Sequence, residues 1–494
     1  MTRGRQALTI KPIDVLLAEM AGEHRLRRAL GPVTLTALGI GCIIGAGIFV
    51  LTGLAANQYA GPALVLSFVV AGLGCAFAAL CYAEFASMVP VAGSAYTYAY
   101  ATLGELFAWI IGWDLVLEYA VAASTVAHGW SHYFESFLGL YGISIPEHWS
   151  VGPIEFNAAT HAWYATGAYL NLPAALIVLA LTGVLVIGIS ESARFNAAMV
   201  IVKIVVVVFV IFAGTPRIDV ANWHPFFPYG AAGVLKGAAY IFFAYVGFDS
   251  VSTHAEEATN PQRDVPIGII ASLAICTILY ILVAGVLTGM VNYTQIDLDA
   301  PVAHAFAHHG MQTAVFIISV GAIAGLTSVL LVLLLSQTRV LLAMARDGLI
   351  SERFFGAVHP RFRTPHKATM LVGVLVALVG STFPLKILAD LVNIGTLMAF
   401  VIVCAAVLVM RRTNPQLHRP FRTPWVPAIP ILGILTNLAM MFALGWENWL
   451  RLAVWLAIGL AIYFGYSQRH SRIAASLNSE LRRGGVSPAG RALD

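Results

Sequence analysis

A glycine-rich stretch, GIGCIIGAGIFVLTG at residues 39–53, interrupts a long apolar segment near the start of the chain. No charged residue occurs between Arg28 and Glu84, so this segment is long enough to cross a bilayer. The hydrocarbon core of about 30 Å takes roughly 20 apolar residues in a helix. Each glycine inside a helix costs about 1 kcal/mol relative to alanine. The clustered glycines therefore predict a membrane-spanning helix that is interrupted near Gly45.

The composition of the whole chain agrees with a membrane location. The 494 residues are 59% hydrophobic and 11% charged, whereas a soluble domain has about 25% charged residues. A soluble globular enzyme needs more charge to cover its surface, and a disordered chain needs low hydrophobicity. The net charge of +4 gives no reason to expect a nucleic-acid partner. The composition indicates an integral membrane protein.

Other charge-free runs predict further spans. They are continuous instead of alternating over about 10 residues, so they predict helices and not the strands of a barrel. The third predicted span is the least regular, because it carries Glu105, Asp114 and Glu118. We expect an all-α integral membrane protein with twelve transmembrane helices, at 33–57, 62–86, 96–127, 171–190, 194–213, 232–253, 266–290, 313–344, 368–384, 387–410, 425–445 and 448–467.

The lysines and arginines predict the orientation. With the N-terminus inside, most of the 28 lysines and arginines fall on the cytoplasmic side, and residues 128–170 contain none. Both termini are therefore expected on the cytoplasmic side. The protein is expected to be a multi-pass protein of the bacterial inner or plasma membrane. The expected segments are a cytoplasmic N-terminal segment (1–32), a first repeat with helices one to five (33–213), an outer loop (214–231), a second repeat with helices six to ten (232–410), helices eleven and twelve (411–467) and a cytoplasmic tail (468–494).

A second interruption is predicted in the sixth span, where FFAYVGFDS at 242–250 contains Gly247. Matched interruptions in the first helices of two five-helix halves are typical of inverted-repeat transporters. Close packing of glycines in a helical bundle is the alternative. At the first break, free N–H groups near Ala46 and Gly47 suit a carboxylate. Free carbonyls near 243–246 suit an ammonium, so the pair suits a zwitterion such as an amino acid.

Asp249 follows the second break. It is expected to cap the new helix start at Ser250, with direct contact to the substrate as the alternative.

Longer motifs give a family resemblance. The chain resembles the amino acid–polyamine–organocation superfamily, and within it the bacterial members of the cationic amino acid transporter family. The matching stretches are GIGCIIGAGIFVLTG (39–53), YAEFASMVPVAGSAYTYAY (82–100), GELFAWIIGWDLVLEYAVAAS (104–124), ESARFNAAMVIVKI (191–204), FFAYVGFDSVSTHAEEATNPQRDVPIGI (242–269) and SQTRVLLAMARDGLIS (336–351). They extend through the first eight predicted spans.

The resemblance implies a fold and a substrate site. The fold is a five-plus-five inverted repeat, similar to the leucine-transporter fold, with broken helices 1 and 6, two additional C-terminal helices and alternating access. By matching position, the substrate carboxylate meets the N–H groups of Ala46 and Gly47. The α-ammonium meets backbone carbonyls, namely those of Ile43, Phe243, Ala244 and Val246.

Lys203 lies inside the fifth predicted span, and a lysine there is a functional candidate because burying its charge is expensive. The resemblance implies that it replaces a sodium ion between helices one, five and eight. Its expected partners are carbonyls near Gly41 and the hydroxyl of Thr327 or Ser328. We expect this lysine to couple transport to a proton, and a lysine that snorkels or makes a fixed structural bond is the alternative.

Asp114 and Glu118 share one face of the third span at i, i+4 spacing, so both are expected to face protein or water. Glu118 matches a family glutamate in GWDLVLEY, either as a proton sensor or as a brace for helix three. Histidines and cysteines show no metal-ligand spacing, so neither a metal nor another cofactor is expected.

These features predict a proton-coupled importer of small or medium neutral L-amino acids such as alanine. A cationic substrate side chain needs an acidic acceptor, and near the breaks only Asp249 and Glu118 could supply one. Cationic amino acids, carried by uniport or exchange, are therefore the alternative. A membrane enzyme needs a catalytic cluster, and a channel needs a continuous polar stripe; neither pattern is visible in the sequence. The expected partners are the amino acid, the proton and the lipid bilayer, with no nucleic acid, and the protein is expected to be monomeric or weakly oligomeric.

Overall fold

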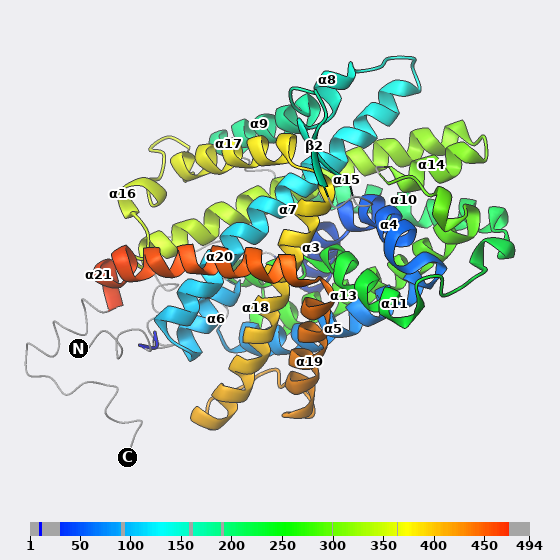
Figure 1. Cartoon of the computed structure of the whole chain (residues 1–494). Coiled ribbons are helices and arrows are strands. Elements are labelled where there is room, and N and C mark those ends of the chain that lie inside the picture. The colour runs from blue at the N-terminus through cyan, green and yellow to red at the C-terminus, as the bar shows by residue number, and fades with distance from the viewer. Residues whose placement is uncertain are drawn as a thin grey trace, which may run out of the picture.

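The computed structural model describes residues 9–11, 30–89, 94–157, 162–188, 192–298, 300–362 and 364–473, and it is predominantly helical (Figure 1). Most of the predicted N-terminal segment 1–32 and most of the predicted tail 468–494 lie outside the described residues. The long helices are α3 (Pro32–Ile43), α5 (Leu64–Met88), α6 (Ser94–Thr102), α7 (Glu105–Gly139), α9 (Leu172–Ile187), α10 (Ser192–Gly214), α11 (Gly230–Ile241), α13 (Pro261–Met290), α14 (Pro301–His308), α15 (Gln312–Arg346), α17 (His366–Thr382), α18 (Leu385–Thr413), α19 (Ala428–Ala443) and α20 (Trp446–Ile462).

Short elements connect or extend these helices. Two antiparallel strands form a hairpin in which Ile154 pairs with Ala165. The short elements are η1 (Gly47–Leu51), α4 (Thr52–Ala55), η2 (Ala56–Ala60), η3 (Gly61–Ala63), α8 (Glu147–Ser150), β1 (Ile154–Asn157), β2 (Ala162–Ala165), η4 (Thr215–Arg217), η5 (Val220–Trp223), η6 (Phe242–Tyr245), α12 (Ser250–Thr253), η7 (Ala255–Glu257), η8 (Tyr293–Gln295), α16 (Glu352–Phe355), η9 (Tyr463–Ser467) and α21 (Gln468–His470).

Eight helical stretches within the described residues are long and apolar enough to cross a membrane. These are Gly47–Met88, Glu105–Gly139, Ala198–Arg217, Gly230–Ser252, Pro261–Met290, Gln312–Arg346, Leu385–Thr413 and Trp446–His470. Four shorter apolar helices are α3, α9, α17 and α19. The prediction of an all-helical, multi-pass membrane protein is confirmed, while the count of twelve spans and the inverted repeat stay predictions.

The third predicted span, 96–127, was placed too early in the chain. The structure divides this region into α6 and the 35-residue helix α7, with Gly104 between them at a φ of +104°. A side chain is strained at such a φ, so the glycine allows the chain to turn there. The carbonyl of Thr9 accepts the N–H of Glu105 at 3.0 Å, which places a piece of the N-terminal segment against this turn.

The second half of α3, from Gly39 to Ile43, is buried in the interior of the bundle. This helix packs against α13, α10 and α15, while α7 packs along α15 and α18 (Figure 1). Large apolar side chains also lie on outward faces, among them Phe212 at 75% exposure and Leu378 at 59%. Such faces suit contact with lipid tails, because a bilayer has no water to make their exposure costly.

Two helical paths are interrupted in the interior. Helix α3 ends at Ile43, the backbone is extended at Ile44, and helical geometry returns at Ala46 before η1. The second path runs through α11 and η6 and then leaves helical geometry at Val246, followed by Gly247 at a φ of +119°. Each interruption lies beside the glycine from which the sequence predicts it.

Candidate functional site

The two interruptions are in direct backbone contact with each other. A Cβ atom added to Gly47 would lie 2.2 Å from the Cα of Ala244, and one added to Gly247 would lie 3.0 Å from the carbonyl of Cys42. Only a residue without a side chain fits at either crossing. The predicted substrate-binding residues of the two breaks are therefore brought together in one place.

The first break offers hydrogen-bond donors. The N–H groups of Gly45, Ala46 and Gly47 donate no backbone hydrogen bond within the described part of the chain. They lie at the N-terminus of a new helical segment, so the positive end of the helix dipole lies at the same place as these N–H groups. A substrate carboxylate would accept hydrogen bonds from these groups, which is the contact predicted for Ala46 and Gly47.

The backbone carbonyls at the breaks offer hydrogen-bond acceptors. One tyrosine contacts two of the four carbonyls that were predicted to meet the ammonium, one at each break. The hydroxyl of Tyr280 lies 2.8 Å from the carbonyl oxygen of Ile43 and 3.0 Å from that of Ala244. The Phe243 carbonyl accepts the N–H of Val246 at 3.1 Å, and the Val246 carbonyl accepts no hydrogen bond within the described residues. Each carbonyl oxygen has two lone pairs, so an ammonium can still be accepted.

Tyr280 is the functional candidate that the sequence reasoning missed. It joins the end of α3 to the second break from a third element, α13. Aromatic neighbours fix its ring, because Phe68 and Tyr245 lie with their ring centroids 5.4 and 5.5 Å away. The available signal was a single aromatic hydroxyl in a largely apolar stretch, ICTILYILVAG at 275–285, which also contains Thr277.

The site is closed to the exterior in this structure. Ala46 is 1% exposed, and Phe243 and Val246 are each 6% exposed. The side chains of Ile43, Ala46, Phe243 and Val246 are apolar, so the polar groups at these four positions are those of the backbone, together with the hydroxyl of Tyr280. A substrate held there would be recognised mainly through its α-carboxylate and α-ammonium.

Lys203 lies in α10 and reaches the first break from the side. Its side chain is fully buried, and its Nζ donates to the carbonyl of Gly41 at 2.6 Å and to the Ser328 hydroxyl at 3.5 Å. Gly325 makes room for its aliphatic stem, because a Cβ there would lie 3.2 Å from the Lys203 Cγ. No carboxylate lies within ion-pair distance of this lysine among the described residues.

Of the two predicted hydroxyl partners, the structure selects Ser328. The Thr327 hydroxyl instead donates to the carbonyl of Ile323 at 2.7 Å and accepts the indole N–H of Trp130 at 2.9 Å. Neighbouring positions on a helix point about 100° apart, so only one of the two can face Lys203. The proposed role of Thr327 as a partner of the lysine is therefore wrong.

Comparisons with known proteins show the family of the chain. The family model described as amino acid permease matches residues 30–464. The chain belongs to the amino acid permease family. A branched-chain amino acid permease of Bacillus subtilis is 51% identical over 464 residues, which cover 94% of this chain and 98% of the relative.

Two further relatives carry different substrate names. A methylthioribose transporter of Bacillus subtilis is 46% identical over 461 residues, covering 93% of this permease and 98% of the relative. A vacuolar cationic amino acid transporter of Arabidopsis thaliana is 40% identical over 413 residues, covering 82% and 67%. All three are named as transporters, so the permease is a membrane transporter and not an enzyme, as its motifs predicted.

Three buried carboxylates belong to α7 and to the segment that follows the second break. Asp114 is fully buried, Glu118 is 2% exposed and Asp249 is 2% exposed. Both carboxylate oxygens of Asp114 and the Oε1 of Glu118 lack a hydrogen-bond partner within the described residues. Both side chains are buried in the protein, which agrees with the prediction that they face protein or water.

Asp249 does not cap the following helix. Its side chain makes no capping bond to α12, which begins at Ser250. Its Oδ2 instead accepts the hydroxyl of Tyr119 at 3.1 Å, which ties the second break to α7. The capping prediction was wrong because Asp249 itself has helical φ and ψ, whereas a capping residue is extended.

An ion cluster fixes the loop between α18 and α19. The Glu84 carboxylate accepts two bonds from Arg411, at 2.9 and 2.8 Å, and pairs with Arg419 at 3.2 Å. It also accepts the backbone N–H of Thr423 at 2.8 Å. These contacts lie at the end of α5, away from the breaks, so they hold a connecting segment and do not form part of the substrate site.

Proposed function

We propose that the permease imports L-amino acids by proton symport with alternating access, and that it favours small or medium neutral amino acids such as alanine. The observation that carries this proposal is the crossing of the two breaks, where Gly47 lies against Ala244. The N–H groups of Ala46 and Gly47 donate no backbone hydrogen bond within the described residues. Opposite helix ends of this kind match the two charges of a zwitterion.

The neutral preference is supported by the side chains at the breaks. Ile43, Ala46, Phe243 and Val246 are apolar, and an additional positive charge on a substrate side chain would need an acceptor. The relative that is 51% identical is named for branched-chain amino acids, which are neutral. Apolar surroundings of this kind suit a short apolar side chain.

A cationic substrate is the second candidate. Glu118 and Asp249 are buried on the side of the second break, and their carboxylates would attract a lysine or arginine side chain. Several relatives are named for cationic amino acids. For such a substrate, uniport or exchange replaces proton symport.

Proton coupling is supported by the surroundings of Lys203. A buried ammonium without an anionic partner carries a desolvation cost that the neutral amine avoids. The lysine donates to Gly41, two residues before the last residue of α3, so gain or loss of its proton changes a contact at the first break. The proposal also includes a fold of twelve spans with an inverted repeat, and an orientation with both termini in the cytoplasm.

Uptake into proteoliposomes tests substrate and coupling together. Radiolabelled alanine, leucine, lysine and arginine are offered with and without an inward proton gradient, at a clamped membrane potential. The proposal expects alanine or leucine uptake that rises with external acidity. Lysine or arginine uptake without any response to the gradient would support the cationic alternative and reject the proposal.

A further inference from the structure

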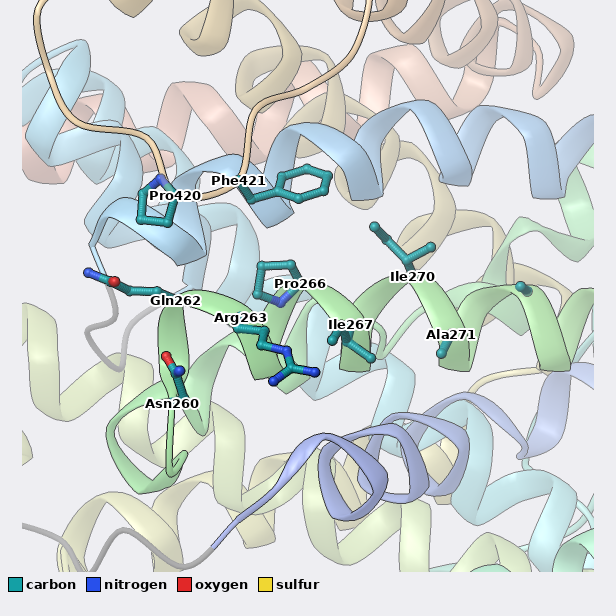
Figure 2. A pocket seen from close by; sticks show the side chains of 10 residues that line it. Asn260, Gln262, Arg263, Pro266, Ile267, Ile270, Ala271, Pro420 and Phe421 are labelled. Carbon is teal, nitrogen blue, oxygen red and sulfur yellow. The ribbon is translucent and has the colours of Figure 1, made fainter.

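A cavity of about 550 Å³ lies between the first turns of α13 and the segment that joins α18 to α19. Figure 2 shows Pro420 and Phe421 of this segment on one side, and Pro266 and Ile270 of α13 on the other. Most of its wall is apolar. Arg263 is the charged residue in the lining, which makes the cavity amphipathic.

The cavity continues a surface that faces lipid. On α13, Ile267, Ile275, Ile278 and Leu282 are 40%, 39%, 59% and 46% exposed. Their spacing places them on one side of the helix, as an uninterrupted apolar stripe. Because α13 is a candidate membrane span, this stripe contacts acyl chains, and Ile267 at its end belongs to the cavity lining.

The positive charge of Arg263 is not compensated locally. It lies one helical turn before Ile267, it is exposed, and its side chain makes no ion pair with any described residue. The adjacent acid, Asp264, is buried and accepts the backbone N–H of Asn260 at 3.0 Å. The guanidinium is therefore free to bind an anion at the end of the apolar stripe.

Two further arginines adjoin the residues of the opposite wall in the sequence. Arg419 and Arg422 flank the lining residues Pro420 and Phe421 in the sequence. Arg419 shares the single carboxylate of Glu84 with another arginine, and exposed Arg422 has no ion pair within the described residues. Basic pockets between membrane-spanning helices attract anionic head groups.

We propose that this cavity binds an anionic phospholipid from the leaflet on its side of the membrane. The positive-inside pattern makes this the cytoplasmic leaflet. The phosphate would lie at Arg263, and one acyl chain would pass along Ile267 and Ile270 under Phe421. A lipid is the occupant that uses both the unpaired charge and the apolar wall, whereas a free phosphate uses only the charge.

Native mass spectrometry of the purified full-length protein tests the proposal. Phosphatidylglycerol and phosphatidylcholine with identical acyl chains are titrated, and bound lipid is counted. Phosphatidylglycerol is expected to bind more tightly, and Arg263→Gln to weaken it about fivefold without changing phosphatidylcholine binding. Arg263→Lys keeps the preference. The matched control is Arg217→Gln, which removes another exposed arginine remote in sequence from the cavity and leaves both lipids unaffected.

A second variant tests the apolar wall without changing the charge. Ala271→Phe fills the cavity, so both lipids are expected to bind several-fold more weakly, while gel filtration shows a folded, monodisperse protein. Unchanged phosphatidylglycerol binding by Arg263→Gln would overturn the proposal, as would unchanged binding by Ala271→Phe. Displacement of the lipid by millimolar glycerol phosphate would also overturn it, because the acyl chain would then contribute nothing.

Discussion

The crossing of the two broken helices predicts a severe effect for the smallest possible change, Gly47→Ala. The added methyl group would lie 2.2 Å from the Cα and 2.4 Å from the Cβ of Ala244. Ordinary contact begins at 3.4 Å, so the two segments must separate by about 1.2 Å. Backbone atoms on both sides prevent relief by a simple rotation of a side chain.

A separation of this size exceeds the range of lengths over which a hydrogen bond persists. A shift of that size along either bond of Tyr280, at 2.8 and 3.0 Å, breaks it. The N–H group of Gly47 also moves away from the substrate carboxylate. Losing one hydrogen bond to a charged group costs about 1.5–3 kcal/mol, so substrate affinity should fall at least about tenfold. Overpacking adds about 1–3 kcal/mol of lost stability.

Uptake kinetics in proteoliposomes measure this loss, and a thermal-shift assay measures substrate binding separately. The control is Gly183→Ala in α9, where an added Cβ meets nothing within 4 Å. This variant should transport normally and be equally or slightly more stable. Wild-type affinity and uptake in Gly47→Ala would refute the proposed contact between the breaks and its role in binding.

Three further changes test separate parts of the structure. Tyr280→Phe removes the hydroxyl between the two breaks, so the apparent affinity for substrate should change several-fold at unchanged protein yield, measured as KM of uptake. Ser328→Ala should alter the pH dependence of uptake while Thr327→Ala leaves it as in the wild type, because only Ser328 contacts the buried lysine; equal pH profiles would contradict that assignment. Glu84→Gln leaves two arginines without their carboxylate and should cost about 3–5 kcal/mol in a denaturation assay, whereas Glu447→Gln, in an exposed ion pair, should cost less than about 1 kcal/mol.

The placement of the two interruptions could be predicted from the sequence. Glycine has a local effect on helix geometry, so the glycine cluster around Gly45 and the single Gly247 indicate where each helix is interrupted. The same reasoning failed at the third span, because Gly104 lies next to charged Glu105 and the apolar pattern continues on both sides of it. Only the backbone turn at Gly104 separates α6 from α7.

The choice between neighbouring partners, and the contact made by Tyr280, could not be predicted from the sequence. Thr327 and Ser328 are neighbours in the sequence, and the rotation of α15 alone decides which of them faces Lys203. Tyr280 is one hydroxyl in an apolar helix, and nothing local shows that it reaches Ile43, which is 237 positions away. Such partners depend on how three helices pack together, which the pattern of one helix does not contain.

The central claim is that Lys203 couples amino acid transport to a proton. The most direct measurement is acidification of a trapped pH-sensitive dye when substrate is added to proteoliposomes, with wild type and Lys203→Met compared at equal incorporation. The claim predicts acidification together with uptake in the wild type. In Lys203→Met it predicts no acidification and no response of uptake to a pH gradient, with substrate binding retained in a thermal-shift assay. Full acidification by Lys203→Met, or none by the wild type during active uptake, would contradict it.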